Sequence, residues 1–120
     1  MKQNPFDIYT AEYEQWFSEN SNLFQSELLA LQKAVPTDKK GLEVGVGSGI
    51  FAEKLNIKHG IDPSESMLEV ARTRGIDAVK GVAESLPYDD ESFDYALYIT
   101  SICFIEDPDI ALKEAYRIIV

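Results

Sequence analysis

From Gly41 onward, short apolar segments alternate with segments of helical pattern, and this alternation constrains the fold more than any other feature of the chain. A strand that is followed by a crossover helix pairs in parallel with the next strand, and the helices then cover both faces of the sheet. We therefore predict an α/β fold with a doubly wound parallel sheet. The predicted strands are 41–46, 57–61, 76–80 and 93–99, and the predicted helices are 50–55, 64–74 and a segment from Asp107 and Pro108 toward Ile119.

The first part of the chain has a different pattern. Aromatic residues at helical spacing predict a helix over 10–20, and Ser21 is predicted to cap a second helix that ends at Pro36. The sequence thus divides into an N-terminal helical segment, residues 1–36, and an α/β core, residues 37–120.

The composition excludes several classes of partner. Twenty-one acidic residues against eleven basic ones give a formal net charge of −10. A surface of this sign repels phosphate groups, so we expect neither a nucleic acid nor a membrane as a partner. The apolar runs are too short to span a bilayer, and the single cysteine, Cys103, cannot form an internal disulfide or a zinc cluster. With no export signal at the N-terminus, the predicted compartment is the cytoplasm.

Residues 43–49 (Glu-Val-Gly-Val-Gly-Ser-Gly) follow from the first predicted strand into a helix. Their three glycines allow a tight turn and let a ligand touch the main chain, although a turn without a ligand is an alternative. A dinucleotide site would have glycine in place of Ile50, and a P-loop would have a lysine. Because the acidic Glu43 stands at the mouth of this turn, we favour a ligand with a positive centre and no phosphate.

Asp62 follows the second predicted strand, and ligands of parallel sheets bind where strands end. A carboxylate at this place is the usual partner of two vicinal ribose hydroxyls, because its two oxygens accept both at once. The alternative is an Asx turn or a helix cap before Pro63 and Ser64. After the third strand, the small-residue turn 81–84 can present backbone groups to an adenine edge.

Together, these segments resemble the class I S-adenosylmethionine-dependent methyltransferases. Residues 86–94 (Leu-Pro-Tyr-Asp-Asp-Glu-Ser-Phe-Asp) are similar to the "LPF-D-SFD" loop of the members that act on small molecules. Residues 114–118 (Glu-Ala-Tyr-Arg-Ile) are similar to the "E-x-x-R" helix of the same group. The resemblance implies a Rossmann-like fold, S-adenosyl-L-methionine as cofactor, and in-line methyl transfer to a small-molecule acceptor.

The resemblance also implies where the methionine part of the cofactor lies. It places Gly45 and Gly47 along the methionine chain, Glu43 near its ammonium group, and Thr100 and Ser101 near the transferring methyl group. The N-terminal aromatic residues resemble the family's lid helix over the cofactor, and plain core packing is their alternative role. These aromatic residues are Tyr9, Tyr13 and Trp16.

A second group of residues is implied at the nucleoside end of the cofactor. Asp62 would hold the ribose hydroxyls, Pro63 and Met67 would flank the adenine, and the backbone N–H of Ala83 would meet the ring with Glu84 beside it. The family usually has aspartate where this chain has Val82, which cannot accept a hydrogen bond from the adenine amino group. Adenine recognition would then depend on backbone groups, stacking or Glu84.

Three functions are compatible with these residues. The first is a methyltransferase, and the second is a non-catalytic S-adenosylmethionine-binding or regulatory module. The third, a nicotinamide-dependent reductase, is disfavoured by Ile50. No residue stands out as a catalytic base: His59 lies inside a predicted strand and is interpreted as structural, and Cys103 is interpreted as a small buried residue.

The family fold has seven strands, and this chain supplies candidates for the first four. We therefore expect the N-terminal part of a longer methyltransferase, incomplete at the C-terminus and inactive or nearly so alone; a natural four-stranded domain is the alternative. The fourth strand, up to Ile99, would then leave an apolar sheet edge exposed, through which the chain could self-associate.

Overall fold

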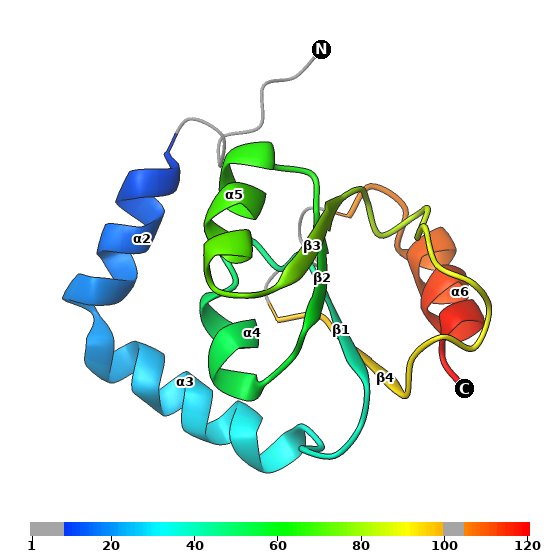
Figure 1. Cartoon of the computed structure of the whole chain (residues 1–120), viewed down its shortest axis with the longest axis horizontal. Coiled ribbons are helices and arrows are strands. Elements are labelled where there is room, and N and C mark those ends of the chain that lie inside the picture. The colour runs from blue at the N-terminus through cyan, green and yellow to red at the C-terminus, as the bar shows by residue number, and fades with distance from the viewer. Residues whose placement is uncertain (1–8, 100–104) are drawn as a thin grey trace.

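The computed structural model describes residues 9–99 and 105–120. Figure 1 shows the path of the chain, in which an N-terminal pair of helices precedes an alternation of strands and helices. The elements are α2 (Thr10–Glu19), α3 (Ser21–Ala34), β1 (Gly41–Val44), α4 (Ile50–Leu55), β2 (His59–Asp62), α5 (Glu65–Thr73), β3 (Asp77–Lys80), β4 (Tyr95–Leu97) and α6 (Pro108–Ile118).

The four strands of the described chain form one parallel sheet in the order β3-β2-β1-β4. Val44 of β1 pairs with Ile61 of β2, and Glu43 pairs with Leu97 of β4, so the carboxyl ends of these strands meet at one edge. Helices α4 and α5 cover one face, α6 covers the other, and α2 and α3 lie outside α4 and α5 (Figure 1). The predicted doubly wound, Rossmann-like α/β fold is confirmed.

The central strand β1 is buried on both faces of the sheet. Leu42 and Val44 point into a core shared with Ile118 of α6. Burying side chains of this size contributes about 1.5–3 kcal/mol each. A second core fills the space between the sheet, α4 and α5 and the N-terminal helices, and its larger members are Phe17, Phe24, Leu28, Phe51, Leu55 and Leu68.

The helices of the α/β core begin and end at the residues that the sequence predicts. The hydroxyl of Ser64 accepts from the backbone N–H of Met67 at 3.4 Å and caps α5. Gly75 follows this helix with a φ of +81°, a value that favours glycine. Asp107 caps α6 by accepting from the N–H of Ile110 at 3.2 Å, with Pro108 as the first helical residue.

The predicted cap at Ser21 is wrong. Ser21 is the first residue of α3, and Asn20 holds the capping position without a side-chain bond to the helix. Instead, the side-chain amide of Asn20 donates to the carbonyl oxygen of Trp16 at 2.8 Å. The asparagine therefore satisfies the end of α2, and α3 begins directly after it.

Several strands are shorter than predicted. β1 ends at Val44 because Gly45 adopts a φ of +79°, which turns the chain, although the N–H groups of Gly45 and Val46 still both donate to the carbonyl of Ile61. β4 spans Tyr95–Leu97 rather than 93–99. Phe93 forms a separate parallel bridge with Ile119, just after α6. These bonds keep the strand order intact and shorten only the regular pairing.

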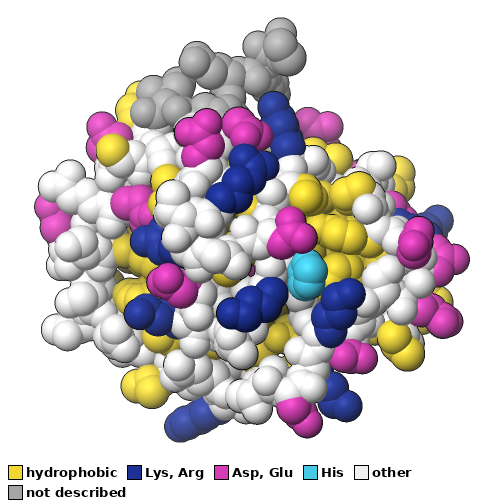
Figure 2. All heavy atoms as spheres, viewed as in Figure 1, with side chains coloured by type: hydrophobic (Ala, Val, Ile, Leu, Met, Phe, Trp, Pro, Cys, Tyr) yellow, Lys and Arg dark blue, Asp and Glu magenta, His cyan; other side chains and the backbone are white. Residues whose placement is uncertain are grey.

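Acidic and basic side chains stand side by side over the face of the molecule seen in Figure 2. Among the described residues, no helix has the length and the apolar character that crossing a membrane requires.

The close approach of β2 to the turn after β1 depends on Gly60. A Cβ added to Gly60 would lie 2.6 Å from the Cβ of Val46. We expect Gly60→Ala to lower the free energy of unfolding by about 1–3 kcal/mol, because the added methyl overpacks this contact. In urea titrations, the double variant Val46→Ala/Gly60→Ala should lose less stability than the sum of the two single variants. Additive losses would show that Gly60 is not required for this packing.

Candidate functional site

The carboxylate of Asp62 joins the ends of β1 and β2. One oxygen, Oδ2, accepts from the backbone N–H of Gly47 at 3.0 Å, and the other, Oδ1, accepts from the N–H of Ser64 at 2.9 Å. The residue is only 9% exposed. Asp62 therefore makes the Asx turn that was the alternative interpretation of this residue, and it also fixes the glycine-rich turn. The ribose role stays a prediction.

Glu43 lies beside Asp62 and is almost fully buried, at 2% exposure. Its oxygen Oε1 has no hydrogen-bond partner among the described residues. Burial and, second, the charge of Asp62 raise the pKa of the Glu43 carboxyl well above its usual value. Asp62 receives two N–H donors, whereas this oxygen of Glu43 receives none.

Tyr13 of α2 lies over these acids. Burial first, and then the charges of Glu43, Glu14, Asp62 and Glu27, raise the pKa of the Tyr13 hydroxyl to about 12. Of the three aromatic residues predicted for a lid, Tyr13 alone packs against the core as a partly buried ring. Tyr9 and Trp16 are 55% and 47% exposed.

The glycine-rich turn has the backbone that its sequence predicts. Gly45, Gly47 and Gly49 all have positive φ values, between +56° and +79°. A Cβ added to Gly47 would meet no other atom within 4 Å, so open space lies beside this residue. A Cβ added to Gly49 would instead lie 3.2 Å from Ala71 and Ile76, so this glycine serves helix packing. Gly47 therefore faces open space, whereas Gly49 does not.

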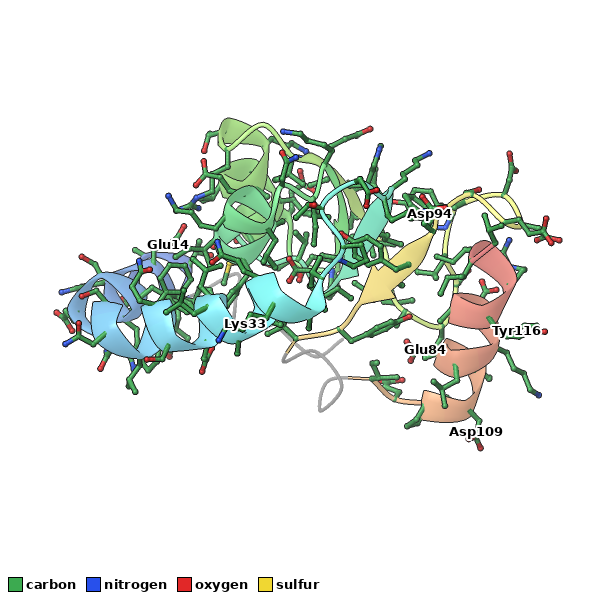
Figure 3. The ribbon with its side chains drawn as sticks, turned by 90° about the horizontal axis from the view of Figure 1, so that it is seen from below. Glu14, Lys33, Glu84, Asp94, Asp109 and Tyr116 are labelled. Carbon is green, nitrogen blue, oxygen red and sulfur yellow. The ribbon has the colours of Figure 1, made fainter. Side chains whose placement is uncertain are left out.

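The turn after β3 carries Ala83 and Glu84 to the same side of the sheet as α6. Ala83 is buried, and Val82 is 46% exposed. The Oε2 atom of Glu84 accepts from the backbone N–H of Glu106 at 3.1 Å and, more weakly, from that of Asp107 at 3.4 Å. Figure 3 shows Glu84 between the sheet and α6. This acid thus holds the start of α6, a role that the sequence did not indicate.

The other residues singled out in the sequence lie in different parts of the molecule. Pro63 is exposed next to Asp62, whereas Met67 is 1% exposed inside the α5 packing. His59 begins β2, at the end of the sheet away from Asp62, and its ring meets Phe93 edge-on at 5.5 Å. That contact fits the structural role predicted for the histidine. The predicted residues outside the described part of the chain are Thr100, Ser101 and Cys103.

The motif that resembles "E-x-x-R" acts as a clamp. The guanidinium of Arg117 donates to the carbonyl oxygens of Leu86 and Tyr88, at 2.9 and 2.7 Å, and pairs with Glu114 at 2.6 Å. Glu114 in turn accepts from the N–H of Leu86 at 2.9 Å. The hydrogen bond from Arg117 lowers the pKa of the Glu114 carboxyl. The clamp fixes the loop 86–94 to α6 and so sets the path of the chain into β4.

Arg74, which the sequence analysis passed over, contacts both the glycine-rich turn and α2. Its Nη1 atom donates to the carbonyl of Ser48 at 2.9 Å and to Glu14 at 2.6 Å. Residues 60 positions apart meet here, so no local pattern in the sequence could indicate the pair.

Comparisons with known proteins agree with this geometry. The profile of the methyltransferase domain matches residues 42–120. An uncharacterised protein of Methanocaldococcus jannaschii is 43% identical over 116 residues, which are 97% of this chain and 56% of that protein. A Thermotoga maritima structure, described as a SAM-dependent methyltransferase and possible histamine N-methyltransferase, is 52% identical with a TM-score of 0.91, and the match covers 95% of this chain and 55% of that one. A 2-methyl-6-phytyl-1,4-hydroquinone methyltransferase of Oryza sativa is 34% identical over 91 residues, which are 67% of this chain and 27% of that enzyme.

The fold and the site thus define a Rossmann-like domain of the methyltransferase type. The chain belongs to the S-adenosylmethionine-dependent methyltransferase family. It spans about half the length of the first two relatives described above, and its four strands correspond to the N-terminal part of the family fold.

The raised pKa of Glu43 predicts a specific pH dependence of stability. Between the ordinary carboxyl pKa of 4.5 and the raised pKa, the folded protein keeps a proton that the unfolded chain has released. The free energy of unfolding therefore falls as the pH rises through this window. Glu43→Gln has no such proton, so we expect the variant to lose less stability than the wild type between about pH 5 and about pH 8 in thermal unfolding.

The exposed residue Glu69 provides the matched control for this measurement. Glu69→Gln removes one acid from α5 and should leave the pH profile of the wild type unchanged. If Glu43→Gln follows the same profile as the control, Glu43 is ionised in the folded protein and the argument from burial is wrong.

Proposed function

We propose that this chain provides the cofactor site of an S-adenosylmethionine-dependent methyltransferase that acts on a small-molecule acceptor. The observation that carries the proposal is the convergence of Glu43, Gly47 and Asp62 at one sheet edge, where Asp62 holds Gly47, a Cβ on Gly47 would meet open space, and the buried Oε1 of Glu43 has no partner among the described residues. The family membership supplies the cofactor's identity.

The residues present fit such a cofactor by their chemistry. The unpartnered oxygen of Glu43 suits a cationic group such as the ammonium of the methionine part. Asp62 accepts from the N–H groups of Gly47 and Ser64, and a carboxylate oxygen can accept more than one hydrogen bond, so these two bonds are compatible with a further bond from a ribose hydroxyl. The site offers acids and backbone groups, which suits a ligand that carries positive charge and no phosphate.

When bound, the cofactor would supply a methyl group on a positively charged sulfur. The lone pair of the acceptor would attack the methyl carbon in line and displace the sulfur as a neutral thioether. The chain's own residues bind the cofactor and orient it. Asp62 fixes the turn so that Gly47 can be approached closely, and Glu43 and Tyr13 place a buried, polar wall against the cationic end. Such a reaction depends on alignment and on exclusion of water more than on a catalytic base.

The N-terminal helices, residues 1–36, form the lid in this proposal. The placement of Tyr13 over the acids supports this role. The acceptor would bind between the lid and the glycine-rich turn. Because the site is acidic and the Thermotoga maritima relative is described as a possible histamine N-methyltransferase, small amines are the first acceptors to test, followed by phenols of the hydroquinone type.

Mass spectrometry of products tests the activity directly. The full-length protein is incubated with S-adenosylmethionine and a panel of amines, phenols and carboxylic acids. A mass gain of one methyl group in an acceptor, with release of S-adenosylhomocysteine, supports the enzyme. Cofactor binding without any methylated product would favour the alternative, a non-catalytic S-adenosylmethionine-binding or regulatory module.

The proposal includes self-association through β4. Within the described residues, β4 pairs with β1 on one side and no named strand lies on its other side. The half-buried Tyr95 and Leu97 therefore lie in an edge strand, and an edge strand can pair with another strand. The net charge of −10 opposes such pairing between two copies at low salt.

Gly47 and Gly75 form a matched pair for testing the cofactor site. Both have positive φ values, and an added Cβ at either position would meet nothing within 4 Å. Gly47→Ala and Gly75→Ala should therefore lose similar stability, about 1 kcal/mol, from backbone strain. In calorimetric titrations with S-adenosylhomocysteine, only Gly47→Ala should bind at least about tenfold more weakly, a loss of about 1.4 kcal/mol, because its methyl group enters the ligand space.

Equal affinities in the two glycine variants would mean that the glycine-rich turn is a turn only. The assignment of the site to residues 43–49 would then be wrong.

Val82→Asp is a gain-of-function test of the adenine position. Val82 is 46% exposed, so an aspartate is tolerated there. If the adenine amino group points at this residue, the added acceptor should tighten binding of S-adenosylhomocysteine by about 0.5–1.5 kcal/mol. Calorimetry that finds unchanged or weaker binding would mean that the adenine is held elsewhere.

A further inference from the structure

Arg74 connects three parts of the molecule that are far apart in the sequence. It stands at the end of α5, and its side chain is 24% exposed. A single nitrogen, Nη1, donates to the carbonyl of Ser48 in the glycine-rich turn at 2.9 Å and to Glu14 of α2 at 2.6 Å. The Nε atom lies 3.6 Å from Glu53 of α4. The guanidinium therefore forms a bridge from the glycine-rich turn to the N-terminal helix.

Helix α2 also contacts the core through aromatic rings. Phe17 is the one residue of α2 that is buried, and its ring meets Phe51 of α4 at 5.8 Å. Glu14 is three residues before Phe17 and therefore lies on the same side of the helix. Figure 3 shows Glu14 on the side of α2 that faces α4 and α5. The aromatic contact and the ion pair together determine how α2 lies on the core.

The ion pair lies next to Tyr13 and helps to hold it in place. Tyr13 is adjacent to Glu14, and its ring packs edge-on against Phe17 at 4.9 Å. It is close enough to Glu43 and Asp62 for their charges to act on its hydroxyl. A rotation of α2 about Phe17 would move Tyr13 away from these acids. Holding Glu14 in place therefore holds Tyr13 over the ligand site.

We propose that Arg74 is a positioning residue that couples the closed lid helix α2 to the glycine-rich turn through its shared bonds to Glu14 and to the Ser48 carbonyl. This inference rests on the proposed cofactor site. Ser48 lies between Gly47 and Gly49, so a change in the shape of the glycine-rich turn moves the Ser48 carbonyl. The Nη1 atom of Arg74 is bonded to this carbonyl and moves with it, and its bond to Glu14 changes as a result. In this proposal α2 moves when the ligand leaves, and the ion pair slows that movement.

Arg72 is the matched control on the same helix. It makes one ion pair, to Glu65 at 2.7 Å, and one bond to a backbone carbonyl, that of Ala78 at 3.1 Å, whereas Arg74 has the additional, longer ion pair with Glu53. Neither partner belongs to α2 or to the glycine-rich turn. Arg72→Gln therefore removes the same kinds of interaction as Arg74→Gln without cutting the bridge.

The experiment measures the release of S-adenosylhomocysteine from the full-length protein. Trp16 lies on α2, so its fluorescence reports on the lid in a full-length protein in which any tryptophan outside these 120 residues has been replaced by phenylalanine. We expect Arg74→Gln and Glu14→Gln each to raise the dissociation rate constant about three- to tenfold, with no further increase in the double variant. Arg72→Gln should release the ligand at the wild-type rate. Effects that multiply in the double variant, or an equal increase in Arg72→Gln, would overturn the coupling.

Hydrogen exchange of the ligand-free proteins separates this inference from the proposed function. Amides of α2 should exchange faster in Arg74→Gln and in Glu14→Gln than in Arg72→Gln, whereas α6 should be unchanged in all three. If the wild type fails to bind S-adenosylhomocysteine, the proposed cofactor site is wrong, and this exchange pattern still supports the bridge. Equal exchange of α2 in all variants would overturn it.

Discussion

The two oxygens of Asp62 organise the carboxyl edge of the sheet. One of them holds the N–H of Gly47 in the turn after β1, and the other holds the N–H of Ser64 at the start of α5. Two segments that follow different strands are thereby fixed to one side chain. Burial and, after it, the charge of Asp62 raise the pKa of the neighbouring Glu43 carboxyl. A single hydrogen-bonded acid thus sets the backbone geometry of the site and contributes to its electrostatics.

The order of elements could be predicted from the sequence because it depends on local patterns. Alternating apolar and helical segments, with caps at Ser64 and Asp107, were sufficient for the parallel sheet and the helix bounds of the core. Strand ends were less predictable, because Val46 has strand-like character and still bonds to Ile61, while the chain has already turned at Gly45. The cap at Ser21 failed for a similar reason, since Asn20 bonds backward to α2.

Side-chain contacts between distant segments could not be predicted in the same way. The sequence places Glu84 near a turn, but only the fold brings the start of α6 within reach of its carboxylate. Likewise, Arg117 was visible as part of a motif, whereas its bonds to the carbonyls of Leu86 and Tyr88 depend on how the loop returns to the helix. A resemblance to a motif indicates that such a residue has a role. The structure then shows which backbone groups the residue bonds to.

The way in which the lid is attached bears on how this fold can serve different acceptors. The glycine-rich turn, Asp62 and Glu43 are built into the sheet, so changes there affect folding as well as binding. Helix α2 meets the core through the buried ring of Phe17, the partly buried ring of Tyr13 and the ion pair of Glu14 with Arg74. Half-buried pairs contribute modestly to stability, so the lid can be altered without loss of the core. Under the proposed function, cofactor recognition is therefore tied to the fold, whereas the surface over the acceptor is free to vary.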